Sequence, residues 1–219
     1  MKVINYSERD SVVSQFMAEL RDTTVQNDRM RFRHNIERIG MLMAYDISKM
    51  LDYKRQAIVT PLTSTDVRVL RDNIVLGTVF RAGLPFHTGF LNIFDKAGNA
   101  FVSAYRYYLD KECTKVGVKI EYIASPALDG KTLIIVDPML ATGDSMELAY
   151  QALKTKGSPS KLFLACVIAS KYGVERLQKV FASDDITLFC GAIDPILNDQ
   201  KYIVPGLGDA GDLMYGDKL

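Results

Sequence analysis

The stretch that decides the fold runs from Leu133 to Ser145 and reads LIIVDPMLATGDS. An apolar run ends in an acid, Asp137, and is followed by a loop of small residues that contains Thr142 and Gly143. Beyond the loop, apolar residues return at helical spacing. A buried strand followed by a small-residue loop and a helix start suits a sugar phosphate, because backbone N–H groups and hydroxyls there can bind an anion.

The same loop also fits an ordinary strand-to-helix turn in which Ser145 is the helix N-cap. It has no G-K-[ST] sequence, so it is not the nucleotide triphosphate loop of that signature. Asp144 complicates the phosphate interpretation, because a carboxylate stabilises a helix start but would repel a phosphate in the same place. We therefore expect Asp144 either to point outward or to weaken anion binding. The loop alone leaves both interpretations open.

Size and composition indicate one domain, residues 1–219, with a full hydrophobic core. The chain is 48% hydrophobic, and its 27 Lys and Arg against 26 Asp and Glu give a net charge of +1. This balance argues against a nucleic-acid or membrane-surface binder, since both need a basic patch. We expect no signal peptide and no membrane span. Three dispersed cysteines predict reduced thiols and a cytoplasmic location, and two histidines make a His-based metal site improbable.

Strand and helix patterns alternate after residue 73, which predicts an α/β fold with a parallel sheet flanked by helices. Helices are expected around 86–94, from 146 to 153 and at 172–181. Ligands bind beyond the carboxyl ends of the strands in such sheets, so Arg81, Arg106 and Asp137 could all face one crevice. The expected buried strands are Asn73–Phe80, Ala100–Tyr105, Leu133–Val136, Lys161–Ala169 and Ile186–Ala192.

Other segments complete the domain. Residues 1–52 predict a helical N-terminal arm that includes a long amphipathic helix from Asp28 to Leu51. Residues 106–122 are polar and predict a flexible hairpin. Near the C-terminus, Gly206 to Gly211 match G-x-G-x-x-G, but too few residues follow for a dinucleotide-binding helix and its downstream acid. Two interpretations of this segment remain: a terminal turn, or a glycine-rich wall that lets a flat ligand approach the backbone.

Together these pieces resemble the uracil phosphoribosyltransferase family over most of the chain. VDPMLATGDS, ending at Ser145, resembles the family's phosphoribosyl-diphosphate motif, and YIVPGLGDAGD at 202–212 resembles its uracil-binding segment. FRAG at 80–83 and AYR at 104–106 resemble its two arginine positions. DRMRFRHNIERIG, from Asp28, is similar to its first long helix. The resemblance implies a phosphoribosyltransferase type I fold with a C-terminal base-binding hood at 193–219.

The resemblance also implies the reaction. Uracil and 5-phosphoribosyl 1-diphosphate would give UMP and diphosphate in pyrimidine salvage, with Mg²⁺ bound through the substrate diphosphate and no protein residue assigned as a metal ligand. It further implies a homodimer or larger homo-oligomer and a possible GTP effector. Two alternatives stay open: a related phosphoribosyltransferase for another base, and a nucleotide-sensing RNA-binding regulator on the same fold.

Functional residues follow from the resemblance by motif position. Asp137, Asp209 and Arg106 would be catalytic. Uracil would be read, mainly through the backbone, by Ile203, Gly208, Asp209 and Ala210. The sugar diphosphate would be bound by Arg81, Arg106, Asp137, Pro138, Met139, Leu140, Ala141, Thr142, Gly143, Asp144, Ser145 and Asp209.

Two further expectations concern this family pattern. Family members commonly carry a second Gly or another residue where this chain has Asp144, so Asp144→Gly should leave or improve affinity for the sugar diphosphate. The hairpin at 106–122 would act as a lid that excludes water and prevents hydrolysis of the sugar diphosphate.

Overall fold

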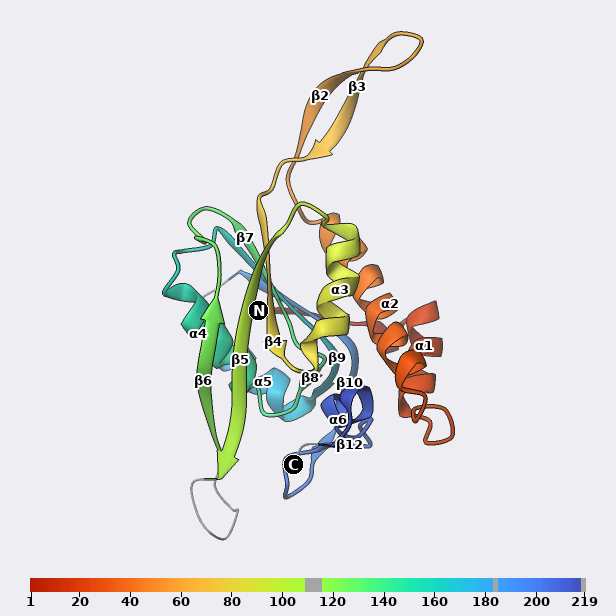
Figure 1. Ribbon diagram of the computed structural model, residues 1–219, viewed down its shortest axis with the longest axis vertical. Helices are drawn as coiled ribbons and strands as arrows, with labels where there is room; N and C mark the ends of the chain where they lie inside the picture. Colours follow the sequence, from red (N-terminus) through yellow and green to blue (C-terminus); the bar gives the residue numbers. More distant parts are fainter. Residues whose placement is uncertain (109–115, 183–184, 218–219) are drawn as a thin grey trace.

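The computed structural model describes residues 1–108, 116–182 and 185–217. In this part of the chain, eight strands form a mixed sheet with helices on both faces (Figure 1). The strand order is β1-β10-β9-β7-β4-β5-β6, and β8 pairs with β9. The strands are β1 (Lys2–Asn5), β4 (Ile74–Phe80), β5 (Gly98–Tyr108), β6 (Val116–Ala124), β7 (Thr132–Val136), β8 (Met139–Leu140), β9 (Lys161–Ser170) and β10 (Ile186–Asp194).

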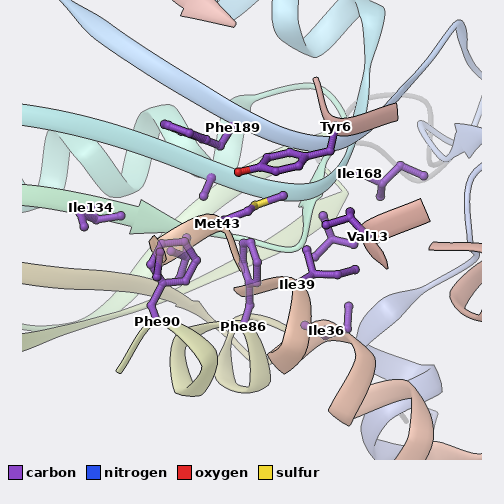
Figure 2. Packing of buried hydrophobic residues seen from close by; sticks show 14 of the residues in the cluster. Tyr6, Val13, Ile36, Ile39, Met43, Phe86, Phe90, Ile134, Ile168 and Phe189 are labelled. Atoms are coloured by element: carbon purple, nitrogen blue, oxygen red, sulfur yellow. The ribbon is translucent and has the colours of Figure 1, made fainter. Parts of the chain in front are cut away.

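Helices cover the two faces of this sheet. Side chains alternate along β7, so that Ile134 and Val136 belong to one buried cluster while Leu133 and Ile135 belong to another. Figure 2 shows the first cluster, in which the N-terminal helices pack on the sheet. Helices α1 (Val12–Arg21), α2 (Arg29–Ser48) and α3 (Gly83–Ile93) contribute to the first cluster, and α4 (Asp144–Lys154) and α5 (Lys171–Val180) to the second. The α/β architecture expected from the sequence is confirmed.

The sheet changes direction of growth between β4 and β7. From β4 the chain passes through α3 to β5 on one side, whereas β7 lies on the other side of β4 and leads through α4 to β9. A crevice opens at such a point because the connecting segments diverge, and ligands bind there beyond the carboxyl ends of the strands. The residues that follow β4 and β7 are therefore placed for binding.

Three local expectations were incomplete or wrong. The 1–52 segment is not helical throughout, because Lys2–Asn5 form β1 and pair in parallel with β10 at the sheet edge. Helix α3 begins at Gly83, before its expected start near 86, and includes Pro85 in its first turn. Arg106 lies within β5 rather than after it, because antiparallel pairing with β6 continues that strand to Tyr108. The sheet is thus parallel except at this edge.

Two segments lie at opposite ends of the molecule (Figure 1). The antiparallel hairpin of β2 (Tyr53–Val59) and β3 (Ser64–Leu70) projects from one end. At the other end, near the carboxyl ends of β4 and β5, the C-terminal segment folds into β11 (Ile196–Leu197), β12 (Ile203–Val204) and α6 (Ala210–Tyr215). No helix among the described residues is long and apolar enough to cross a membrane.

Candidate functional site

Arg81 and Asp137 follow adjacent parallel strands and so reach the same edge of the sheet. Thr78 of β4 pairs with Val136 of β7, and the two functional candidates come directly after these strands. Asp137 is only 9% exposed, and its Oδ1 accepts a hydrogen bond of 3.2 Å from the N–H of Met139. This bond helps to fix the turn that leads into the small-residue loop.

The loop after Asp137 reaches α4 through a left-handed glycine. Gly143 is the N-cap residue with φ of 87°, and a Cβ at this position would also lie 3.3 Å from Cδ2 of Leu177. The plain-turn interpretation expected Ser145 to be the N-cap. This is wrong, because the backbone already turns at Gly143 and the helix begins at Asp144. The positive end of the α4 dipole lies directly behind the loop.

Helix α5 supports the loop from behind. The hydroxyl of Ser170 donates to the carbonyl oxygen of Ala141 at 2.5 Å and accepts from the N–H of Gly173 at 2.8 Å. A Cβ on Gly173 would lie 2.5 Å from the Ala141 oxygen, so glycine allows this close approach. Pro138 and Leu140 are buried, so their side chains shape the loop from within the core.

The carboxylate of Asp144 is held by Arg176 of α5 and by Thr142. Arg176 forms an ion pair with Asp144, and Thr142 Oγ1 donates to Asp144 Oδ2 at 2.7 Å. Arg176 also reaches Glu147 at 2.8 Å and the carbonyl oxygen of Thr142 at 3.3 Å. Sequence reasoning missed Arg176, because nothing local indicates a partner 32 residues away for Asp144.

The residues proposed to bind uracil differ in exposure. Ile203 and Ala210 belong to the first hydrophobic cluster, whereas Gly208 is exposed and has φ of 88°. Asp209 is the N-cap of α6 and accepts from the N–H of Asp212 at 3.1 Å. Gly208 therefore has backbone open to a ligand, and the reading of uracil through this segment stays a prediction.

Two cavities border this segment. One of about 380 Å³ separates the small-residue loop from the C-terminal segment, and Thr142, Tyr172, Ile196 and Lys201 are among its lining residues. The other, of about 850 Å³, lies between the start of α2 and the C-terminal segment; Arg29, Arg33, Gly208 and Asp209 are among its lining residues.

An ion pair joins the C-terminal segment to the residue after β4. Arg81 Nη2 lies 2.8 Å from Asp212 Oδ1, and Arg81 Nη1 lies 3.5 Å from the carbonyl oxygen of Gly216. The Arg81 side chain remains 40% exposed. The FRAG segment and the end of the chain, 131 residues apart, therefore meet at one point.

A second ion pair anchors the C-terminal segment and was not found from the sequence. Arg21 at the end of α1 binds both carboxylate oxygens of Asp194 at 2.8 Å, and Asp194 also accepts from the N–H of Gly206 at 2.8 Å. Arg33 of α2 donates to the carbonyl oxygen of Met214 at 2.7 Å. The N-terminal helices thus hold the segment against the sheet through contacts more than 170 residues apart in the chain.

We expect Asp194→Ala to lower the free energy of unfolding by about 2–3 kcal/mol, because it leaves Arg21 and the Gly206 N–H without their shared acceptor. Urea denaturation measures the loss. The KM for the base should rise as well, because the segment loses its anchor. Glu175→Ala, which removes an exposed partner 4.0 Å from Lys171, is the control and should change stability little. Equal losses in both variants would contradict the anchoring role.

Three further sequence predictions concern β5, the hairpin and the cysteines. Arg106 in β5 pairs with Val118 of β6, and its proposed role stays a prediction. The expected lid forms the end of β5 and most of β6, but its residues 109–115 lie outside the described residues. Cys166 and Cys190 are buried with their sulfur atoms 3.3 Å apart, and burial raises the pKa of the Cys166 thiol. They are core residues.

Comparison with known proteins identifies the family. Residues 7–217 match the family model for uracil phosphoribosyltransferase. A uracil phosphoribosyltransferase of Porphyromonas gingivalis is 53% identical over 219 residues, covering 100% of both chains. One from Pyrococcus furiosus is 34% identical over 218 residues, covering 98% of this chain and 90% of the relative.

Solved structures agree with this fold. A structure of an Aquifex aeolicus protein superposes with a TM-score of 0.86 at 28% identity and covers 98% of each chain. The sheet, the two helical layers and the strand-to-loop arrangement are those of the phosphoribosyltransferase type I fold implied by the resemblance. The chain belongs to the uracil phosphoribosyltransferase family.

Proposed function

We propose that this protein transfers the phosphoribosyl group of 5-phosphoribosyl 1-diphosphate to uracil, giving UMP and diphosphate. Family membership supports this reaction. The observation that carries it is the meeting of Arg81 with Asp212, because it brings the arginine proposed for diphosphate to the segment proposed for uracil. A transfer between two substrates needs both binding elements at one place.

The sugar diphosphate would lie across the carboxyl ends of β4 and β7. Its 5-phosphate would bind residues 141–145, where the α4 dipole and the backbone favour an anion. Arg81 and Arg106 would hold the diphosphate, and Asp137 would contact the ribose hydroxyls or the metal-bound substrate. As diphosphate leaves, positive charge develops on the anomeric carbon, and the Asp137 carboxylate favours that charge.

Uracil would bind the C-terminal wall. Ile203, Gly208 and Ala210 would offer backbone donors and acceptors to its O2, N3 and O4 edge, and Asp209 would contact the substrate or its metal shell. Cytosine would reverse one donor and one acceptor and leave buried groups unpaired.

A magnesium ion would be bound mainly by the substrate. Among the described residues, no group of three or more His, Cys, Asp or Glu side chains is gathered as for a metal ion. Mg²⁺ commonly binds through one or two carboxylates plus substrate phosphates, and Asp137 and Asp209 could supply these. When bound, the ion neutralises charge on the diphosphate; the protein side chains orient both substrates and favour the cationic sugar.

A panel of bases tests the substrate. With Mg²⁺ and the sugar diphosphate, we expect uracil to give UMP and cytosine to react about 10⁴-fold more slowly, because of the reversed hydrogen-bonding edge. Chromatographic separation of the nucleotides measures both. Hypoxanthine and guanine serve as controls for a purine enzyme. Turnover of a purine base, or no turnover together with tight RNA binding, would exclude the proposed function.

The assembly, effector and location implied by the resemblance remain predictions. A homodimer or larger assembly is supported by the β2–β3 hairpin, where Val59 and Leu62 are 86% and 95% exposed and a second copy could cover them. Light scattering measures the assembly. Repeating the base panel with GTP tests the effector. A cytoplasmic location rests on the sparse cysteines, of which Cys166 and Cys190 are free thiols.

A further inference from the structure

The proposed 5-phosphate site, residues 141–145 at the start of α4, lies beside two carboxylates, which disfavour the binding of an anion. The first turn of α4 contains two acids, Asp144 and Glu147. Each carboxylate would repel a phosphate bound at this helix start, and repulsion between charges a few ångströms apart is strong where water is partly excluded. Some other group must therefore offset these charges if the loop is to bind the sugar phosphate.

Arg176 contacts both acids. Its Nη1 forms an ion pair with Asp144 Oδ1, and its Nη2 lies 2.8 Å from Glu147 Oε2. The three side chains are each between a quarter and two-fifths exposed, so bulk water screens them only in part. One cation shared by two acids reduces the local charge from two negative to one, and it draws the Asp144 carboxylate toward α5.

Arg176 also fixes the direction of the loop backbone. Its Nη1 donates to the carbonyl oxygen of Thr142 at 3.3 Å, while Ser170, the N-cap residue of the same helix, donates to that of Ala141. The peptide bonds that follow these carbonyls are not cis. In a trans peptide unit the C=O and N–H point in opposite directions, so the N–H groups of Thr142 and Gly143 point away from α5. Two consecutive amides are thereby aimed at the open side of the loop.

We propose that Arg176 is a positioning residue for the 5-phosphate. It neutralises Asp144, holds that carboxylate away from the anion and turns the loop amides toward the substrate, without itself contacting the reacting atoms. The inference deepens the proposed function and rests on residues 141–145 being the 5-phosphate site. It also changes the expectation for Asp144, which is one half of a pair with Arg176 rather than an isolated departure from the family pattern.

The test separates the two ends of the substrate. Ribose 5-phosphate carries only the 5-phosphate, and inorganic diphosphate with Mg²⁺ resembles only the leaving group. We expect Arg176→Gln to weaken ribose 5-phosphate binding about tenfold, because Asp144 and Glu147 are left unpaired beside the anion. Calorimetric affinity for diphosphate and the KM for uracil should stay within twofold. Lys179→Gln removes an exposed positive charge from the last turn of the same helix and is the matched control.

A second substitution distinguishes positioning from general damage to the fold. In the double variant Arg176→Gln with Asp144→Asn, the uncompensated charge of Asp144 is gone, so ribose 5-phosphate affinity should recover to within about threefold of the original protein. A structural loss would not be rescued in this way. If the double variant binds no better than Arg176→Gln alone, or if Arg176→Gln binds like Lys179→Gln, the inference is wrong. If the original protein does not bind ribose 5-phosphate, the proposed role of the loop fails with it.

Discussion

Replacing Arg81 with Gln is expected to lower kcat/KM for the sugar diphosphate by about 100- to 1,000-fold, because a preorganised cation at a leaving group contributes on this scale. Arg81 follows β4 at the point where the sheet changes direction, and its guanidinium is held by Asp212 at 2.8 Å. In this arrangement the carboxylate of Asp212 binds the guanidinium group that would otherwise donate hydrogen bonds to a diphosphate oxygen. Steady-state kinetics with each substrate varied in turn measures the effect.

Two companion variants make this result specific. Arg81→Lys keeps the charge but loses the planar fork, so it should recover only part of the activity. Arg31→Gln is the matched control: Arg31 pairs with Glu19 of α1 at 2.8 Å, and its loss should leave kcat/KM unchanged. A thermal melt shows whether either variant is destabilised. If Arg81→Gln retains the original KM for the sugar diphosphate and the original kcat, Arg81 does not bind the diphosphate.

Asp137→Asn is expected to lower kcat by about 100-fold or more, because it removes the negative charge that favours the cationic sugar. The substitution keeps the shape of the side chain and an oxygen that can still accept from the N–H of Met139, 3.2 Å from Oδ1. The turn into the loop should therefore persist. Single-turnover measurements separate a loss in the chemical step from a loss in binding.

The other end of the same strand supplies the control for this prediction. Asp129 precedes β7, and its Oδ1 accepts from the N–H of Ser158 at 2.8 Å. Asp129→Asn makes the same chemical change at the amino end of β7, where parallel sheets do not bind ligands, and should leave kcat unchanged. A similar kcat for Asp137→Asn and the original protein would show that the Asp137 carboxylate takes no part in the reaction.

Local sequence patterns predicted the strands and the helix whose apolar side chains follow a regular period. The apolar runs that became β4, β7, β9 and β10 are nearly continuous, as expected for strands buried on both faces. The helix from Asp28 was also evident, since its apolar residues recur every three to four positions. Strand β1 was missed because Lys2–Asn5 is short and is stabilised by pairing with β10 rather than by its own pattern.

The candidate site divides in the same way. The loop at 137–145 and the C-terminal glycines could be identified from the sequence, because phosphate and backbone recognition need particular small residues at particular positions. The ion pairs around these residues could not be identified from the sequence. From the sequence, the carboxylate of Asp144 was expected to repel a phosphate. In the structure this carboxylate forms an ion pair with Arg176 of α5.

By itself, the sequence determined the alternating α/β order and the strand-to-loop motif, since each depends on residues close together in the chain, and it indicated the family because several such local motifs occur together. Only the tertiary structure decided which charges meet: Arg81 with Asp212, Arg21 with Asp194, and Arg176 with Asp144. The physical reason is that an ion pair depends on a few ångströms of separation in space, and no local periodicity specifies partners that lie 32 to 173 residues apart.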